Sequence, residues 1–130
     1  MNTKTLISRI SAIIAAIILL QTLYFKFTAH PDSVYIFSTL GVEPYGRIGL
    51  GIMELIAGVL LIVPRTTVIG ALLALGLIFG AVASHLFILG IEVQNDGGAL
   101  FMLALAVLAT SAITIILRKD ELLELKKKIM

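Results

Sequence analysis

The sequence contains no cysteine, and only 14% of its 130 residues are charged, compared with about 25% in an ordinary soluble domain. Without cysteine, the chain has no disulfide and no thiol ligand for an iron–sulfur cluster, a covalently attached haem or a zinc ion. Hydrophobic residues make up 59% of the chain, and its mean hydropathy is +1.09. This composition excludes a disordered protein, a nucleic-acid binder and a conventional water-soluble enzyme, and the length has room for one domain.

Four long apolar runs account for most of the chain. They cover residues 6–27, 45–63, 66–90 and 97–117, and each is close to the roughly 20 residues that a helix needs to cross a bilayer. We therefore expect an all-α integral membrane protein whose residues 1–130 form one transmembrane domain, a four-helix bundle. The first run continues through Phe27 without a small-residue cleavage site, so we interpret it as a retained helix rather than a signal peptide.

Basic residues are unequally divided between the predicted loops. Eight of the ten fall at the two chain ends or in the turn at Pro64 and Arg65, and only Lys26 and Arg47 fall on the other side. By the positive-inside rule, both termini are predicted to be cytoplasmic, with the loops at 26–46 and 91–96 outside. The tail, residues 118–130, is expected to extend the fourth helix or to lie on the anionic inner leaflet.

Turn residues and glycines refine this outline. The segment from Pro31 to Gly41 predicts a short helix in the first outer loop, lying on the membrane surface or closing the outer end of the bundle. Pro44 is predicted to start the second span, Pro64 to end it, and Asn95 with Asp96 to cap the fourth.

Small residues repeat every fourth position in the third span, at Gly76, Gly80 and Ser84. Such a stripe allows close approach of helices in lipid. We interpret it as a packing seam inside the bundle, with a homodimer seam as the alternative.

Glu54 is the one acidic residue placed well inside a predicted span. An unpaired charge at that depth costs at least a few kcal/mol, so intramembrane ionisable residues are functional by default. At about 1.5 Å per residue, Gln21, Glu54 and His85 lie roughly 9, 14 and 8 Å below the outer ends of their helices. Arg47 precedes Glu54 by two helical turns, on nearly the same face. The sequence therefore predicts an outward-facing polar pocket formed by Gln21, Arg47, Glu54 and His85.

A purely structural interpretation of the same residues remains open. In it, Arg47 neutralises Glu54, and His85 donates to a backbone carbonyl or to Glu54. A metal site is not expected, because the second histidine, His30, lies in a loop, and no nucleotide-binding or hydrolase motif occurs. No cofactor is evident from composition or motifs, although a Glu/His pair beside an arginine has the chemistry to hydrogen-bond a quinone head group, or to relay protons or a small solute.

Several short motifs resemble the DoxX-like family of small bacterial membrane proteins. They are the run GRIGLGIMELIAG at 46–58, the turn at 64–65, the small pairs at 70–71 and 80–81, SHL at 84–86, and flanking motifs at 30–31, 40–44 and 96–98. This resemblance covers roughly residues 20–117 and implies a four-helix bundle of the bacterial inner membrane. The family is named after a small subunit of a thiosulfate:quinone oxidoreductase, and its members are associated with membrane redox processes. The resemblance thus implies that Arg47, Glu54 and His85 are pocket residues, although this chain lacks the cysteines of thiol-active relatives.

Three hypotheses follow from these observations. The first is a redox-associated or quinone-linked membrane subunit, at most part of an oxidoreductase, which receives electrons from a soluble or membrane redox partner. The second is a small transporter or proton-coupled permeation unit, and the third is a non-enzymatic scaffold. A bound quinone, a measurable flux, or neither would discriminate them, and a homo-oligomer is compatible with each.

Overall fold

The protein consists of helices connected by short loops. The computed structural model describes residues 2–129, which contain no strand. Its elements are α1 (Thr3–Phe27), α2 (Pro31–Thr39), α3 (Tyr45–Ile62), η1 (Pro64–Thr66), α4 (Thr67–Ser84), the π-helical turn η2 (His85–Leu89), α5 (Ala99–Leu117) and α6 (Lys119–Ile129). Four segments, namely α1, α3, α5 and the continuous stretch from η1 to η2, are long and apolar enough to cross a membrane. The predicted all-α membrane bundle is confirmed.

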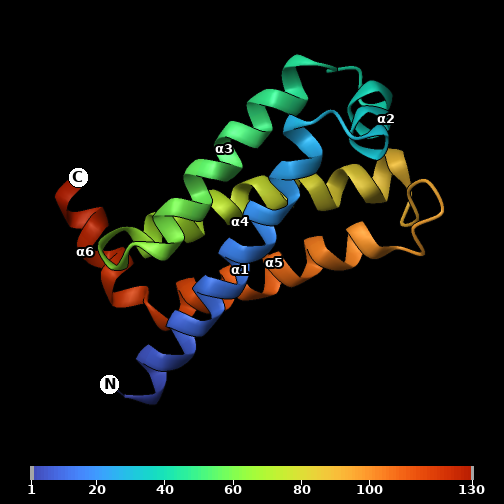
Figure 1. Ribbon diagram of the computed structural model, residues 1–130. Helices are drawn as coiled ribbons and strands as arrows, with labels where there is room; N and C mark the ends of the chain where they lie inside the picture. Colours follow the sequence, from blue (N-terminus) through green and yellow to red (C-terminus); the bar gives the residue numbers. More distant parts are fainter. Residues whose placement is uncertain (1, 130) are drawn as a thin grey trace.

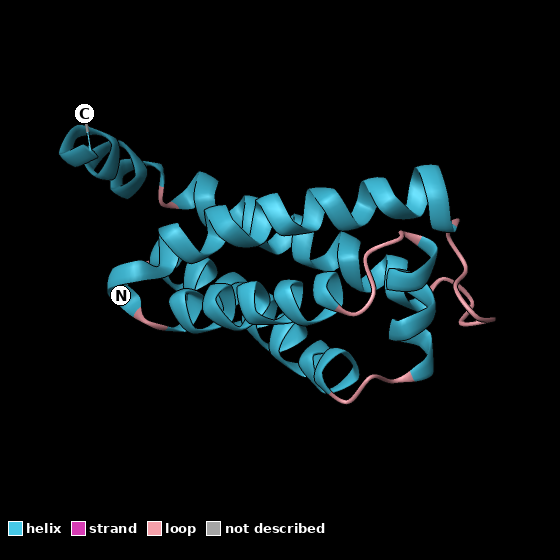
Figure 2. Cartoon of the chain, turned by 90° about the horizontal axis from the view of Figure 1, so that it is seen from above, coloured by secondary structure: helices cyan, strands magenta, loops and turns pink. Residues whose placement is uncertain are grey.

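The four long helices run up and down in chain order (Figure 1). Each packs on the next, and α5 closes the ring against α1. Both chain ends and η1 lie at one end of the bundle, which we call the terminal end, whereas α2 and the 90–98 loop lie at the opposite end, the loop end. Helix α6 is separated from α5 by a break at Arg118 and projects away from the bundle (Figure 2), so the tail does not simply continue the fourth span.

The centre of the bundle is built from small side chains, and the large apolar ones lie outside. Seven of the eleven core residues are alanines: Ala12, Ala15, Ala16, Ala57, Ala71, Ala74 and Ala104. Large side chains such as Ile17, Phe79 and Ile116 are more than half exposed. This distribution suits lipid, where an exposed aliphatic chain costs nothing and close helix packing depends on small residues.

Two contacts between helices depend on glycine, because a Cβ atom at either position would collide with the neighbouring helix. A Cβ atom on Gly58 would lie 2.7 Å from Cδ2 of Leu20, and one on Gly70 would lie 2.5 Å from the backbone nitrogen of Leu61. A larger residue would therefore displace the side chain of Leu20 at the first position, and would push the backbone of α4 away from α3 at the second.

The glycine stripe of α4 behaves differently. Gly76 and Gly80 are exposed, and a Cβ atom on either would have no other heavy atom within 4 Å beyond the helix itself. The prediction that this stripe is a packing seam inside the bundle is wrong, because four-residue spacing places the glycines on one face without indicating whether that face meets a neighbour.

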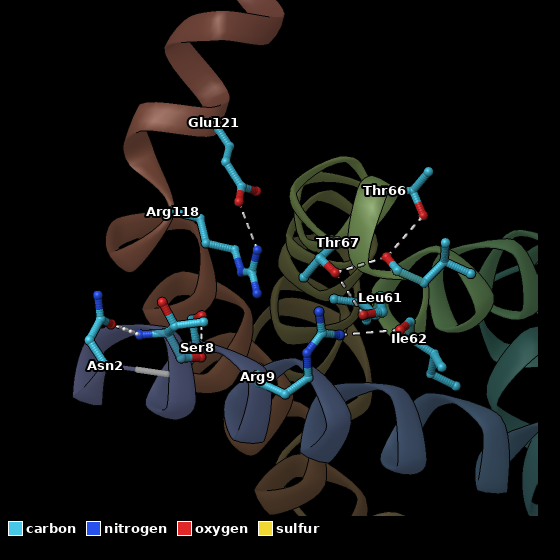
Figure 3. A network of polar contacts seen from close by, with 11 residues as sticks. Asn2, Ser8, Arg9, Leu61, Ile62, Thr66, Thr67, Arg118 and Glu121 are labelled. Carbon is cyan, nitrogen blue, oxygen red and sulfur yellow. Dashed lines mark hydrogen bonds and ion pairs between the residues drawn. The ribbon is translucent and has the colours of Figure 1, made fainter.

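Hydroxyl and guanidinium groups tie the terminal end together (Figure 3). The buried Oγ1 of Thr67 donates to two carbonyl groups at the end of α3, at 3.1 and 3.0 Å, and Nη1 of Arg9 donates to the carbonyl of Ile62 at 3.2 Å. Nη1 of Arg118 lies 2.9 Å from Oε1 of Glu121 in the first turn of α6. The bonds from Thr67 and Arg9 satisfy carbonyl groups at the end of α3 that the apolar surroundings would otherwise leave unpaired.

Asp96 organises the 90–98 loop. Its Oδ1 accepts from the amides of Val93 and Gly98 at 3.0 and 2.8 Å, and its Oδ2 accepts from the amide of Leu100 at 3.2 Å. Desolvation by burial alone would raise the pKa of this carboxyl, but the three amide hydrogen bonds outweigh it, and the pKa of Asp96 is lowered. The predicted cap of the last span is therefore confirmed for Asp96, and Pro44 precedes α3 as predicted.

Candidate functional site

Glu54 lies in the middle of α3 and faces α1 inside the bundle. Only 8% of the residue is exposed. The helical repeat places Thr22 and Lys26, four residues apart near the end of α1, on one face of that helix. Nζ of Lys26 lies 3.1 Å from Oε2 of Glu54. The hydroxyl of Thr22 shares its proton between the carbonyl of Leu19, at 2.8 Å, and the same oxygen of Glu54, at 3.3 Å. The intramembrane carboxylate is thus paired, and its partner is a lysine of the neighbouring helix.

Arg47 is buried, yet it does not pair with Glu54. Its Nε donates to Oε1 of Glu43 at 2.8 Å, and its Nη1 donates to the backbone carbonyl of Lys26. Two helical turns separate Arg47 from Glu54, about 10 Å along the axis, whereas Glu43 is one turn away on the other side. Arg47 therefore holds the last turn of α1 against the start of α3 and positions Lys26.

His85 begins the π-helical turn η2. The amide of Gly90 donates to its carbonyl at 2.7 Å, and Nδ1 of its ring lies 3.0 Å from the carbonyl oxygen of Gly90. Because a carbonyl only accepts, Nδ1 carries the proton, which leaves Nε2 of a neutral ring as an acceptor. The buried ring packs edge-on against Phe101, and Nε2 has no hydrogen-bond partner among residues 2–129. Single π-helical turns of this kind often occur at functional sites.

Two cavities meet at these side chains. The larger, about 370 Å³, lies between α2, α3 and α4, and we call it the lateral cavity. The smaller, about 110 Å³, extends into the core between α1, α4 and α5, and we call it the core cavity. Lys26, Glu54 and His85 line both cavities. We call these three residues the polar cluster.

A third cavity of about 200 Å³ connects Lys26 with the loop end of the bundle. Besides Lys26 and Thr22, its lining includes Asp32 of α2 and Asp96 of the 90–98 loop. Lys26 therefore lines all three cavities. Lys26 therefore lies between two carboxylates of the loop end, those of Asp32 and Asp96, and the intramembrane carboxylate of Glu54.

The structure brings together two of the four residues predicted for the pocket. Glu54 and His85 line both the lateral cavity and the core cavity. Arg47 lines neither, and Gln21, which is exposed on α1, also lines neither. Sequence reasoning missed Lys26 and Thr22. Their i,i+4 spacing, with polar groups recurring on one face of an apolar helix, was the available signal. In the sequence, Lys26 instead reads as a loop charge that marks the orientation of the chain in the membrane.

The polar cluster offers donors and acceptors rather than metal ligands. Among residues 2–129, no group of three or more histidine, aspartate or glutamate side chains is arranged to hold a metal ion. The ammonium of Lys26 donates, Nε2 of His85 accepts, and the carboxylate of Glu54 accepts when ionised. This combination can bind a ligand that carries carbonyl or hydroxyl oxygens, and it can exchange protons with it.

Comparison with known proteins agrees with this architecture. No curated protein and no solved structure matches the chain. A family model does match, over residues 10–113, which include most of α1 and α5, all of α3 and α4, and the whole polar cluster. The chain is an integral membrane protein that belongs to the DoxX-like family.

Proposed function

We propose that the protein is a redox-associated membrane subunit that binds a quinone at the polar cluster. The observation that carries this proposal is a paired intramembrane carboxylate beside an unpartnered histidine nitrogen, both at the inner end of a cavity of about 370 Å³. Ligand pockets of this kind combine an apolar lining with a few convergent polar groups and usually measure about 300–1,000 Å³.

The chemistry of a quinone fits the three side chains. A quinone carbonyl oxygen accepts a hydrogen bond from the ammonium of Lys26, and the hydroxyl of the reduced form donates to Glu54 or to Nε2 of His85. Reduction of the quinone consumes two electrons and two protons. A partner subunit or soluble redox protein supplies the electrons, and the polar cluster supplies the protons.

Protons have a route to the polar cluster from the loop end. The cavity lined by Asp32 and Asp96 reaches Lys26, whose ammonium lies against Glu54. The excess of basic residues at the terminal end supports a cytoplasmic location of both chain ends, in the inner membrane of a bacterium. Proton exchange at the polar cluster would then take place with the outside of the cell.

Binding of decylubiquinone to protein in lipid nanodiscs tests the proposal. We expect the wild type to bind, and we expect Glu54→Gln and His85→Ala each to weaken binding by about tenfold or more, because each removes a hydrogen bond from a desolvated site. Glu92→Gln serves as the control, since Glu92 is an exposed loop carboxylate. Absence of binding to the wild type, or unchanged affinity in both cluster variants, refutes the proposal.

The alternative of a transporter needs a polar path through the terminal half of the bundle. Buried hydroxyls do occur there, at Ser8, Ser111 and Thr114. They are separated from the polar cluster by the core of alanines together with Leu61 and Val107, both at most 1% exposed. A proton or solute flux through liposomes containing the protein, abolished by Glu54→Gln, would favour transport over quinone binding.

A further inference from the structure

The lateral cavity has a gap in its outer wall. Gly76 and Gly80, one turn apart on α4, line the cavity and are exposed on the surface of the bundle. A Cβ atom on either glycine would have no neighbouring heavy atom within 4 Å beyond the helix. At these two positions the wall of the cavity is therefore no thicker than the backbone of α4.

The lining of the lateral cavity is apolar along most of its wall and polar at one end. Apolar side chains of three helices surround it: Ile36, Phe37 and Leu40 of α2, Leu50 of α3 and Leu77 of α4. The inner end is formed by the polar cluster, where Nε2 of His85, in a residue that is 94% buried, has no hydrogen-bond partner among residues 2–129. The cavity is therefore amphipathic, with apolar side chains along most of its wall and the polar cluster at one end.

We infer that the lateral cavity opens sideways into the bilayer, and that it admits an amphiphile with a polar head and a hydrocarbon chain through the gap at Gly76 and Gly80. The head reaches the polar cluster, and the chain lies across the two glycines between α3 and α4. This inference rests on the proposed function and deepens it, since it defines the ligand as a lipid-soluble, chain-bearing molecule that arrives from the membrane rather than from water.

The polarity of the cavity favours a lipid-soluble ligand over a second copy of the chain. Glycines four residues apart are a common seam between transmembrane helices. A second copy would present the apolar outer face of a helix, such as that of Phe79 on α4, which is 58% exposed. Such a face covers the glycines but offers no polar atom to His85 or Glu54. An amphiphile satisfies both ends of the cavity.

A pair of quinones that differ only in the chain tests whether the chain lies in the gap at Gly76 and Gly80. Gly80→Leu places a branched side chain in the gap, and we expect it to weaken binding of decylubiquinone by about tenfold or more. The same variant should bind the chain-free ubiquinone head group as the wild type does, because the polar cluster is untouched. Gly49→Leu is the matched control. Gly49 is also an exposed helical glycine without neighbours within 4 Å, but it lies on α3 and does not line the cavity.

A second measurement is independent of quinone binding. The chain has no tryptophan, so Phe37→Trp places a single fluorophore at the wall of the lateral cavity. In vesicles of phosphatidylcholine with brominated chains, we expect strong quenching of this fluorophore, and we expect Gly80→Leu but not Gly49→Leu to reduce it.

The outcomes are distinguishable. If the wild type binds neither quinone, the proposed function fails, and the quenching experiment alone decides whether lipid chains enter the cavity. If Gly80→Leu leaves both decylubiquinone affinity and quenching unchanged, the lateral opening is refuted. Disulfide-linked dimers of a Gly76→Cys variant in native membranes would also refute it, since they would show that a second copy covers the gap.

Discussion

Removal of one partner of the ion pair between Lys26 and Glu54 should destabilise the bundle far more than removal of both. At a distance of 3.1 Å between Nζ and Oε2, the attraction is about 5 kcal/mol for an effective dielectric constant of about 20. The two side chains are only 15% and 10% exposed, so much of this attraction offsets the cost of desolvating them. A single substitution leaves one charge buried without its partner.

We therefore expect Lys26→Met and Glu54→Gln each to lower the free energy of unfolding by about 3 kcal/mol, and the double variant to lose clearly less than the sum of the two. A coupling energy above about 2 kcal/mol is the predicted result of the double-mutant cycle. Reversible unfolding in mixed detergent micelles measures each free energy under identical conditions.

The pair between Arg118 and Glu121 provides the control cycle. Its N–O distance is 2.9 Å, and although the side chain of Arg118 is only 10% exposed, that of Glu121 is 54% exposed. Water therefore screens this pair, and we expect a coupling of about 0–1 kcal/mol. If the cycle of Lys26 and Glu54 gives a coupling as small as this control, the intramembrane pair is effectively hydrated, and the reasoning from burial is refuted. A folded double variant also separates the remaining hypotheses, because a scaffold would keep all its properties, whereas a quinone-binding protein would lose its ligand.

Three further predictions concern single positions. Gly70→Ala should destabilise the protein by about 2 kcal/mol or more, since the new Cβ would lie 2.5 Å from the backbone nitrogen of Leu61. Gly49→Ala should instead raise the free energy of unfolding by about 0.5–1 kcal/mol, because the methyl group meets no neighbour and alanine favours the helix; a lower value would contradict the open surroundings of Gly49. Asp96, with its lowered pKa, should stabilise the fold above the ordinary aspartate pKa of about 3.9 and lose this contribution as the pH falls through the lowered value. Unfolding measured against pH should accordingly show a weaker acid dependence in Asp96→Asn than in the wild type.

The fold could be predicted because the bilayer imposes few solutions on an apolar chain. Each helix must be long enough to span the hydrocarbon region, so hydropathy alone located the four spans to within a few residues. Local signals then located the ends: Pro44 precedes α3, Pro64 begins the turn after it, and Asp96 caps α5. Each of these signals acts on the backbone within a few residues of its own position, so the helix end that it marks can be recognised from the sequence alone.

The site was only partly predictable, because its contacts cross between helices. Glu54 and His85 could be identified from their rarity inside apolar spans. The partner of Glu54 could not, because it depends on the rotation of α1 relative to α3. That rotation brings Lys26 to the carboxylate, while Arg47 turns to Glu43. The open face at Gly80 has the same cause, since residue spacing defines a helix face but not its neighbour.

The arrangement of the polar cluster argues for a ligand rather than for a purely structural network. A structural network inside a membrane protein is most stable when every donor and acceptor is paired and enclosed. Here Glu54 is held by Lys26 and Thr22, yet it borders two cavities, and Nε2 of His85 has no hydrogen-bond partner among residues 2–129. The same helix pair could have been joined at lower cost by apolar side chains, as it is around Gly58 and Leu20. A cluster that stays incomplete beside a cavity is explained if a second molecule completes it.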